Sequence, residues 1–222
     1  MARTIQFAPG EFYHVYNRGT EKRDIFIDSI DFDRFLTILY LANQTAPADL
    51  KLQGRTLYKV EPRQGEVLVD LAAYCLMPNH LHLLIRERSD NGISKFMQKV
   101  TTGYTMYFNK RYERTGGLFQ GTFKATHVDN DRYLRYLVSY IHLNPVKLID
   151  PKWKENGITD RMRAETYLEN YAYSSYLDFL SKRRLQAMLL SRGVLPNYFA
   201  SGLDFKSQIT EWLSYHNESL QG

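Results

Sequence analysis

The stretch Tyr74-Cys75-Leu76-Met77-Pro78-Asn79-His80-Leu81-His82-Leu83-Leu84-Ile85 predicts two strands joined by a tight Met-Pro-Asn turn. Alternate side chains of a strand point to the same side of a sheet. His80 and His82 should therefore share one face, while Leu81 and Leu83 face the core. Two imidazoles side by side on a rigid strand can bind a metal ion. A His-x-His pair alone is also compatible with two ordinary strand histidines, so the rest of the chain has to decide.

Composition narrows the class of protein. The 222 residues, 44% of them apolar, are enough for one domain of roughly 150 residues plus a tail or small subdomain. The net charge of +5 favours a polyanionic partner. Cys75 is the single cysteine, which excludes an internal disulfide and a Cys-rich zinc site. Residues 1–10 do not resemble a signal peptide, and residues 67–85 are too short and polar to span a membrane. We therefore expect a soluble cytoplasmic protein with no membrane partner.

Hydrophobic periodicity extends the prediction outward from the hairpin, whose strands we place at 66–75 and 80–86. Alternation predicts further strands at 12–19 and 118–128, and helical spacing predicts helices at 28–43, 91–111 and 133–143. This order predicts an α+β sandwich, with helices covering one face of a mainly antiparallel sheet. Residues 45–65 are expected to form an irregular connection with a short strand at 56–60. Beyond Asp150, we expect a loop at 151–159 and helices at 174–193 and 204–216.

The helix at 133–143 supplies the second half of a possible site. Tyr140 and Asn144 are four residues apart and so share one helical face. If this face meets the histidine face of the sheet, a phenol and an amide oxygen join two imidazoles. Such a set suits phosphodiester cleavage, in which Tyr140 attacks phosphorus to form a phosphotyrosine and a metal polarises the phosphate. The energy of the phosphodiester is kept, so a second DNA end can be joined without a nucleotide cofactor.

The same residues allow simpler interpretations. An aromatic core stripe would explain the helix equally well, with Tyr133, Tyr136, Leu137, Tyr140 and Ile141 as its members. Asn144 before Pro145 is an ordinary helix-ending pair. His142 lies off the Tyr140–Asn144 face and is expected to be exposed. His14, on the first strand, is either a further ligand or a plain strand residue.

The basic residues concentrate between Asn91 and His127, where six Lys or Arg stand against one acid, with aromatic residues interleaved. This mixture fits a groove that follows a nucleic-acid backbone and stacks on its bases. A solvated helix face over an aromatic core would explain about half of these residues equally well. The predicted DNA contacts are Arg18, Lys95, Lys99, Tyr104, Arg111, Arg114 and Lys124.

Several motifs together resemble one family. The run from Met77 to Leu84 is similar to the HUH motif, with Leu81 as its hydrophobic residue, and Tyr140-Ile141-His142-Leu143-Asn144-Pro145-Val146-Lys147 is similar to the tyrosine helix of single-tyrosine HUH transposases. Three further segments resemble the same family, namely 13–19, 117–124 and Tyr173-Ser174-Ser175-Tyr176. The resemblance runs from about residue 8 to residue 180. Within the family it is greatest to the REP-associated tyrosine transposases, which are domesticated relatives of insertion-sequence transposases.

The resemblance implies a ferredoxin-like catalytic domain, which we place at 1–150, followed by a helical C-terminal extension at 151–222. It also implies a divalent metal ion, Mg²⁺ or Mn²⁺, and cleavage and rejoining of single-stranded DNA beside a hairpin. By analogy, Tyr140 is the nucleophile, and His80, His82 and Asn144 are the metal ligands. Insertion-sequence relatives often have glutamine at the last of these positions, whereas the REP-associated branch has asparagine. Both a monomer and a homodimer are compatible with the family.

Two other functions fit the same residues. The chain could be a domesticated protein that binds hairpin DNA without significant nicking activity. It could also be a structural metal-binding or RNA-binding protein of similar fold, which would show no preference for single-stranded DNA over RNA. Metal-dependent nicking separates the first hypothesis from both of these.

Overall fold

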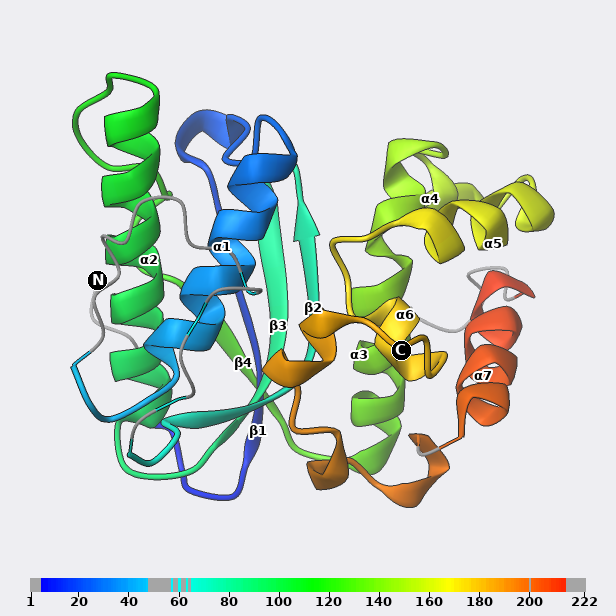
Figure 1. Cartoon of the computed structure of the whole chain (residues 1–222). Coiled ribbons are helices and arrows are strands. Elements are labelled where there is room, and N and C mark those ends of the chain that lie inside the picture. Colours follow the sequence, from blue (N-terminus) through cyan, green and yellow to red (C-terminus); the bar gives the residue numbers. More distant parts are fainter. Residues whose placement is uncertain are drawn as a thin grey trace.

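The computed structural model describes residues 5–47, 57, 60, 63, 65–199 and 201–214 (Figure 1). Its centre is a four-stranded antiparallel sheet with strand order β2-β3-β1-β4. The strands are β1 (Phe12–Arg18), β2 (Val69–Met77), β3 (His80–Glu87) and β4 (Lys124–Val128). This topology is the ferredoxin-like arrangement, so the predicted α+β sandwich with an antiparallel sheet is confirmed.

Helices cover both faces of the sheet (Figure 1). On one face lie α1 (Ser29–Ala42) and α2 (Gly92–Arg111), and on the other lies α3 (Asp131–Leu143). The expectation that helices cover a single face was therefore wrong. The C-terminal part adds α4 (Trp153–Asn156), α5 (Arg161–Asn170), α6 (Tyr176–Phe179) and α7 (Gly202–Ser214), besides short 3-10 helices at Thr20–Lys22, Asn144–Leu148, Leu185–Leu189, Arg192–Val194 and Asn197–Phe199.

The side chains of β3 point alternately to the two faces of the sheet, which explains why there is a hydrophobic core on each face. Leu81, Leu83 and Ile85 are fully buried against the α1 and α2 side, as the sequence predicted for the two leucines. Leu84 points the other way, into a second core that α3 shares with the C-terminal helices. The histidines of β3 alternate with these leucines and so face α3. The hairpin therefore fixes which side of the sheet carries the imidazoles.

Both faces of β2 are buried, and its outer edge is covered as well. The backbone N–H of Leu76 donates to the carbonyl of Tyr173 at 2.9 Å, and the N–H of Ser175 donates to the carbonyl of Tyr74 at 3.0 Å. An edge strand with unpaired N–H and C=O groups would otherwise invite pairing with another chain. The segment around Ser174 thus ties the C-terminal part of the chain to the sheet.

Several predicted elements differ from the observed ones. The strand expected at 118–128 forms only from Lys124, because Gly121 has a φ of +70°, in the left-handed region that strands do not use. The helix expected at 174–193 ends at Phe179, since Ser181 has a φ of +59° and Arg184 is extended. In the loop expected at 151–159 the chain forms α4, and α5 was not predicted. Most of the short strand expected at 56–60 lies outside the described residues.

Among the described residues, no helix is both long and apolar enough to cross a membrane. The expected helix at 204–216 is present as α7 up to Ser214, and its last two positions lie outside the described residues. The helices at 28–43 and 91–111 are present as α1 and α2, and Asp28 caps α1 by accepting hydrogen bonds from the N–H groups of Ile30 and Asp31.

Candidate active site

Three histidines lie together on the face of the sheet that α3 covers. His80 and His82 come from β3, and His14 comes from the neighbouring strand β1. The Nε2 atom of His14 is 2.8 Å from the Nδ1 atom of His82, and the two rings stack with centroids 5.0 Å apart. The ring centroids of His80 and His82 are 5.1 Å apart at an angle of 89°. Sequence reasoning left His14 open, and the structure places it in this cluster.

The hydrogen bonds of these rings leave one nitrogen of each β3 histidine available. The amide of Asn79 donates from Nδ2 to the carbonyl of Lys22, so its Oδ1 accepts from Nδ1 of His80 at 2.6 Å. Nδ1 of His82 is in turn engaged by His14. In both rings it is therefore Nε2 that can bind a ligand. Metal-binding histidines commonly have their other ring nitrogen held in this way.

Burial keeps these imidazoles neutral near neutral pH. Desolvation, followed by the charge of Lys154, lowers the pKa of His14 to about 4. Desolvation also lowers the pKa of His80 to about 4, with Lys147, Lys154 and Arg18 contributing. The pKa of His82 falls well below its ordinary value, again chiefly through burial. A neutral imidazole is the form that binds a metal ion, so protons do not compete for these nitrogens at pH 7.

Tyr140 projects from α3 toward the histidines. Its ring meets that of His82 edge-on, with centroids 5.6 Å apart, and lies 6.1 Å from that of His14. The hydroxyl oxygen accepts a hydrogen bond from Nζ of Lys154 at 3.0 Å. The helix is oriented by its N-cap Asn130, whose side chain accepts from the N–H of Tyr133 at 2.8 Å. The tyrosine face of the helix and the histidine face of the sheet thus meet.

Asn144 caps the C-terminal end of α3 and is 1% exposed. Its Nδ2 donates to the carbonyl of Tyr140 at 2.8 Å, which fixes the amide one helical turn below the phenol. No three His, Cys, Asp or Glu side chains among the described residues are grouped to hold a metal ion. The predicted ligands His80, His82 and Asn144 carry imidazole nitrogens and an amide oxygen, which are donor types that divalent metal ions accept.

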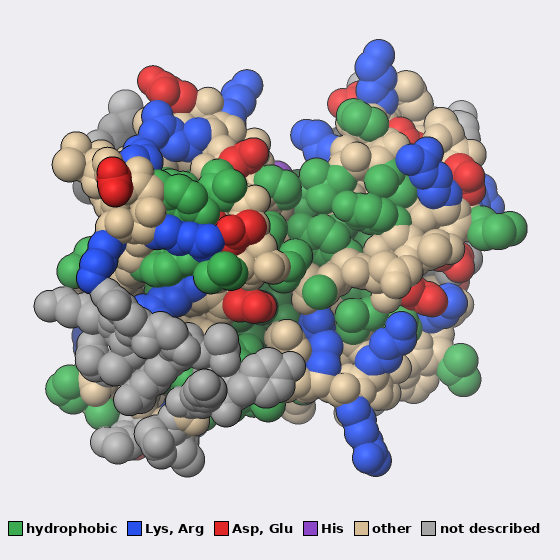
Figure 2. All heavy atoms as spheres, turned by 45° about the horizontal axis from the view of Figure 1, so that its top comes forward, with side chains coloured by type: hydrophobic (Ala, Val, Ile, Leu, Met, Phe, Trp, Pro, Cys, Tyr) green, Lys and Arg blue, Asp and Glu red, His purple; other side chains and the backbone are tan. Residues whose placement is uncertain are grey.

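Three cations lie close enough to the cluster to lower the pKa of His80. Arg18, Lys147 and Lys154 are the charges that act on His80, and they come from three separate segments. Of these, sequence reasoning identified only Arg18 as a contact. Lys147 lies only three residues after Asn144 in the sequence, and this closeness to the tyrosine helix could have indicated that it belongs to the site. Figure 2 shows the molecule hollowed between the lobe with α1 and α2 and the lobe with α4 and α5, with a histidine visible in the hollow and Lys or Arg side chains beside it.

The predicted DNA contacts lie on two different sides of the molecule. Arg18 is the last residue of β1 and pairs with His80 of β3. Lys124 is the first residue of β4 and pairs with Tyr16 of β1, so both basic residues lie on the sheet that carries the histidines. The remaining five, Lys95, Lys99, Tyr104, Arg111 and Arg114, belong to α2 or the turn after it, across the sheet from the histidines.

Two of the α2 residues have clear intramolecular roles. Lys99 donates from Nζ to the carbonyl of Gln44 at 2.7 Å, and Arg111 forms ion pairs with Asp28 and with the buried Asp31. These contacts join α2 to α1 and to the segment that follows it. Both side chains therefore support the fold in this structure.

Tyr104 was predicted to stack on bases, and this prediction was wrong. Its side chain is 0% exposed, and its ring packs edge-on against Phe35. The helical spacing that suggested an aromatic platform is the spacing of a core stripe. Stacking a base on this ring would require α2 to separate from α1.

His142 was expected to be exposed, and this was also wrong, because it is fully buried. Its Nδ1 donates to the carbonyl of Val138 at 2.8 Å, and its Nε2 lies 2.7 Å from Oγ of Ser175. Burial lowers its pKa to about 3. The residue therefore connects the tyrosine helix to the segment that covers the edge of β2.

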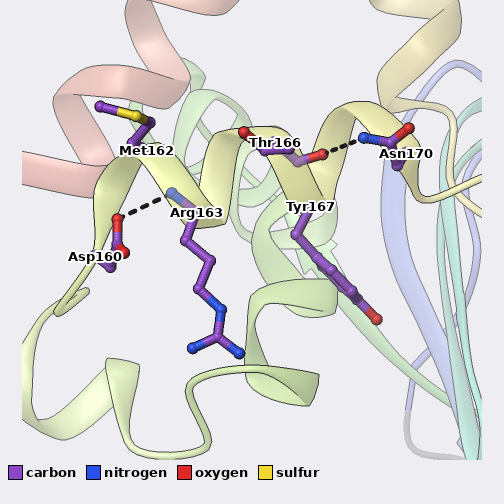
Figure 3. A pocket seen from close by; sticks show the side chains of 6 residues that line it. All are labelled: Asp160, Met162, Arg163, Thr166, Tyr167 and Asn170. Atoms are coloured by element: carbon purple, nitrogen blue, oxygen red, sulfur yellow. Dashed lines mark hydrogen bonds between the residues drawn. The ribbon is translucent and has the colours of Figure 1, made fainter.

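A pocket lies along α5 (Figure 3). Its lining residues are Asp160, Met162, Arg163, Thr166, Tyr167 and Asn170. Asp160 caps the helix by accepting from the N–H of Arg163, and the amide of Asn170 donates to the carbonyl of Thr166. These bonds stabilise the helix ends, and the pocket shares no residue with the histidine cluster.

Comparisons with known proteins show which proteins this chain resembles. Residues 50–144 match the family described as IS200-like transposases, a range that includes both β3 histidines, Tyr140 and Asn144. The structure of a REP-associated tyrosine transposase bound to a REP hairpin is similar in fold, with a TM-score of 0.55 and 14% identity over 88% of this chain and 89% of that one. A transposase structure from Deinococcus radiodurans matches with a TM-score of 0.38 and 16% identity, over 64% of this chain and 95% of that one. No curated protein matches the chain.

Proposed function

We propose that this chain, whose residues 50–144 match the IS200-like transposases, is a metal-dependent single-stranded DNA endonuclease and strand transferase with Tyr140 as its nucleophile. One observation carries the proposal. The phenol ring of Tyr140 packs against His82. It does so on the face of the sheet where both histidines of β3 lie. This contact supports the proposal, because it joins two residues with proposed roles that lie about 60 positions apart in the chain.

The proposed reaction exchanges one phosphate ester for another. The hydroxyl oxygen of Tyr140 attacks phosphorus, a new P–O bond forms to the tyrosine, and the bond to one sugar oxygen breaks. The phenol proton passes to solvent, and the departing sugar oxygen takes up a proton to become a hydroxyl. Because the phosphotyrosine keeps the ester energy, attack by another sugar hydroxyl reverses the step and joins DNA. Cleavage and rejoining therefore need no nucleotide cofactor.

His80, His82 and Asn144 would hold Mg²⁺ or Mn²⁺, which would polarise the phosphate and offset charge on the leaving oxygen. The chain's own part is to orient these ligands. Asn79 and His14 fix the two rings, and the backbone of Tyr140 fixes the amide. Since imidazole suits Mn²⁺ better than Mg²⁺, we expect higher activity with Mn²⁺.

The proposed substrate is single-stranded DNA beside a hairpin. The neighbour of similar fold is bound to a REP hairpin, and the cations beside His80 offer phosphate contacts here. Residues 1–150 would form the catalytic domain, and 151–222 a helical extension that packs against α3. Arg18 and Lys124 remain our proposed DNA contacts, to which we add Lys147.

A second function is a hairpin-DNA-binding protein without significant nicking. The contact between Lys154 and the Tyr140 hydroxyl would in that case only hold the side chain. The experiment that separates the two is a denaturing gel of labelled hairpin DNA, taken from beside the gene, with and without Mn²⁺. We expect a metal-dependent covalent adduct that disappears in Tyr140→Phe and persists in the matched control Tyr136→Phe. Tight binding in a native gel without any adduct would favour the binding protein.

A further inference from the structure

Lys154 lies at the centre of the site although it belongs to α4, which follows the family match at 50–144. Its Nζ donates to the hydroxyl oxygen of Tyr140 at 3.0 Å and lies 4.2 Å from the centroid of the same ring. Both side chains are half-buried. The ammonium therefore contacts the very atom that must attack phosphorus.

The position of this ammonium is supported by the other contacts of α4. The neighbouring Trp153 packs against the core shared by α3 and the C-terminal helices, and its backbone N–H donates to the carbonyl of Asp150 at 3.2 Å. The carboxylate of Asp150 in turn accepts from the N–H and the hydroxyl of Thr159. Hydrogen bonds to Asp150 therefore hold the chain both before and after Lys154.

The charge of Lys154 also acts on the imidazoles. It contributes to the lowered pKa of His14, of His80 and of His82, so it lies near all three rings as well as the phenol. An ammonium that contacts the proposed nucleophile is close to where a scissile phosphate would bind. Charge-assisted hydrogen bonds are about twice as strong as neutral ones.

We propose that Lys154 is a catalytic residue that holds the Tyr140 hydroxyl oxygen and stabilises the negative charge on it during attack on phosphorus. This rests on the proposed function. In the forward step the O–P bond to Tyr140 forms and the bond from phosphorus to the sugar oxygen breaks, while Lys154 remains protonated and the phenol proton goes to solvent. In the rejoining step a sugar hydroxyl attacks, the tyrosine oxygen leaves with its electron pair, and the same ammonium stabilises it. Solvent then returns the proton.

The test compares Lys154→Met and Lys154→Arg with the wild type and with Lys152→Met, an exposed lysine on the same turn. The rate of adduct formation is measured in a single turnover at saturating hairpin DNA with Mn²⁺. Binding is measured separately in a native gel, and folding by thermal unfolding. Removing one preorganised donor costs on the order of 100-fold in rate. We expect that loss in Lys154→Met, with the DNA dissociation constant and Tm nearly unchanged, partial recovery in Lys154→Arg, and a wild-type rate in Lys152→Met.

A wild-type rate in Lys154→Met, or a defect confined to DNA binding, would overturn the proposal while leaving Tyr140 as nucleophile. Failure of the wild type itself to form an adduct would overturn the proposed function along with it. A hairpin DNA with sulfur in place of the leaving sugar oxygen gives a second readout, because sulfur is the better leaving group. The defect of Lys154→Met should persist on this DNA. Its disappearance would place Lys154 at the leaving oxygen and contradict the assigned role.

Discussion

The Nε2 atom of His14 lies 2.8 Å from the Nδ1 atom of His82, with both side chains buried. Only one of the two nitrogens can carry the shared proton. For Nε2 of His82 to offer its lone pair to a metal ion, the proton must be on Nδ1 of the same ring. His14 must then accept at Nε2 and carry its own proton on Nδ1. The contact therefore selects the tautomer of a proposed ligand.

Replacing His14 by Ala should weaken Mn²⁺ binding about 10- to 100-fold, the usual effect of removing a group that orients a metal-binding histidine. Isothermal titration of the DNA-free protein measures this directly. His14→Gln, which can still accept a hydrogen bond, should lose less. The matched control is His127→Ala, an exposed histidine on β4 that pairs with Glu11. Equal Mn²⁺ affinity in His14→Ala and wild type would remove His14 from the site.

Lys147 should contribute more to DNA binding than Lys95 does. Lys147 acts on His80, whereas Lys95 is exposed on α2 across the sheet. Loss of one phosphate contact lowers the slope of log affinity against log salt concentration by about 1 and weakens binding to all sequences alike. We expect this change for Lys147→Ala and not for Lys95→Ala. A similar change in both would show that α2 also contacts the DNA.

Stability should fall as pH is lowered from 7.5 toward 5. The folded pKa is about 4 for His14 and His80 and about 3 for His142, below the ordinary value of 6.5. Between these values the unfolded chain binds more protons than the folded one, so acid favours unfolding. Each such histidine contributes up to about 1.4 kcal/mol per pH unit below 6.5. Urea unfolding across this range measures the slope, and His142→Gln should reduce it by about one proton. An unchanged slope in that variant would contradict the assignment.

Ser175 should stabilise the tyrosine helix through His142. Since Nδ1 of His142 donates to Val138, its neutral Nε2 must accept from the Ser175 hydroxyl, and Ser175 Oγ also accepts from the N–H of Tyr74 at 2.9 Å. Ser175→Ala leaves these buried groups unpaired and should destabilise the protein by about 1–3 kcal/mol.

The neighbouring Ser174 provides the control for this prediction. Its Oγ accepts a longer bond, 3.3 Å, from the N–H of Tyr176. Ser174→Ala should therefore cost less in urea unfolding than Ser175→Ala does. The reverse order would show that the link from His142 to the sheet edge contributes little.

Much of the fold could be predicted from local pattern. The alternation around His80 and His82 gave the hairpin, its core-facing leucines and the shared face of the imidazoles, and Asp28 marked the start of α1. These features depend on neighbours a few residues away. The four-stranded sheet followed from the order of such elements.

Features that depend on distant contacts could not be predicted in this way. His14 joins His82 across 68 residues, and only the pairing of β1 with β3 brings them together. Lys154 lies in a segment without periodicity that was expected to be a loop, so nothing near it indicated its contact with Tyr140. The burial of Tyr104 and His142 likewise depends on which helix faces which core.

Tyr140 should become covalently attached to DNA during the reaction. The most direct measurement is mass spectrometry of the protein after reaction with hairpin DNA and Mn²⁺, followed by nuclease and protease digestion. We predict a nucleotide attached through phosphate to the peptide that contains Tyr140, and no such peptide without the metal ion. Attachment at Tyr136 or Tyr133, or DNA cleavage with no attached nucleotide, would contradict it.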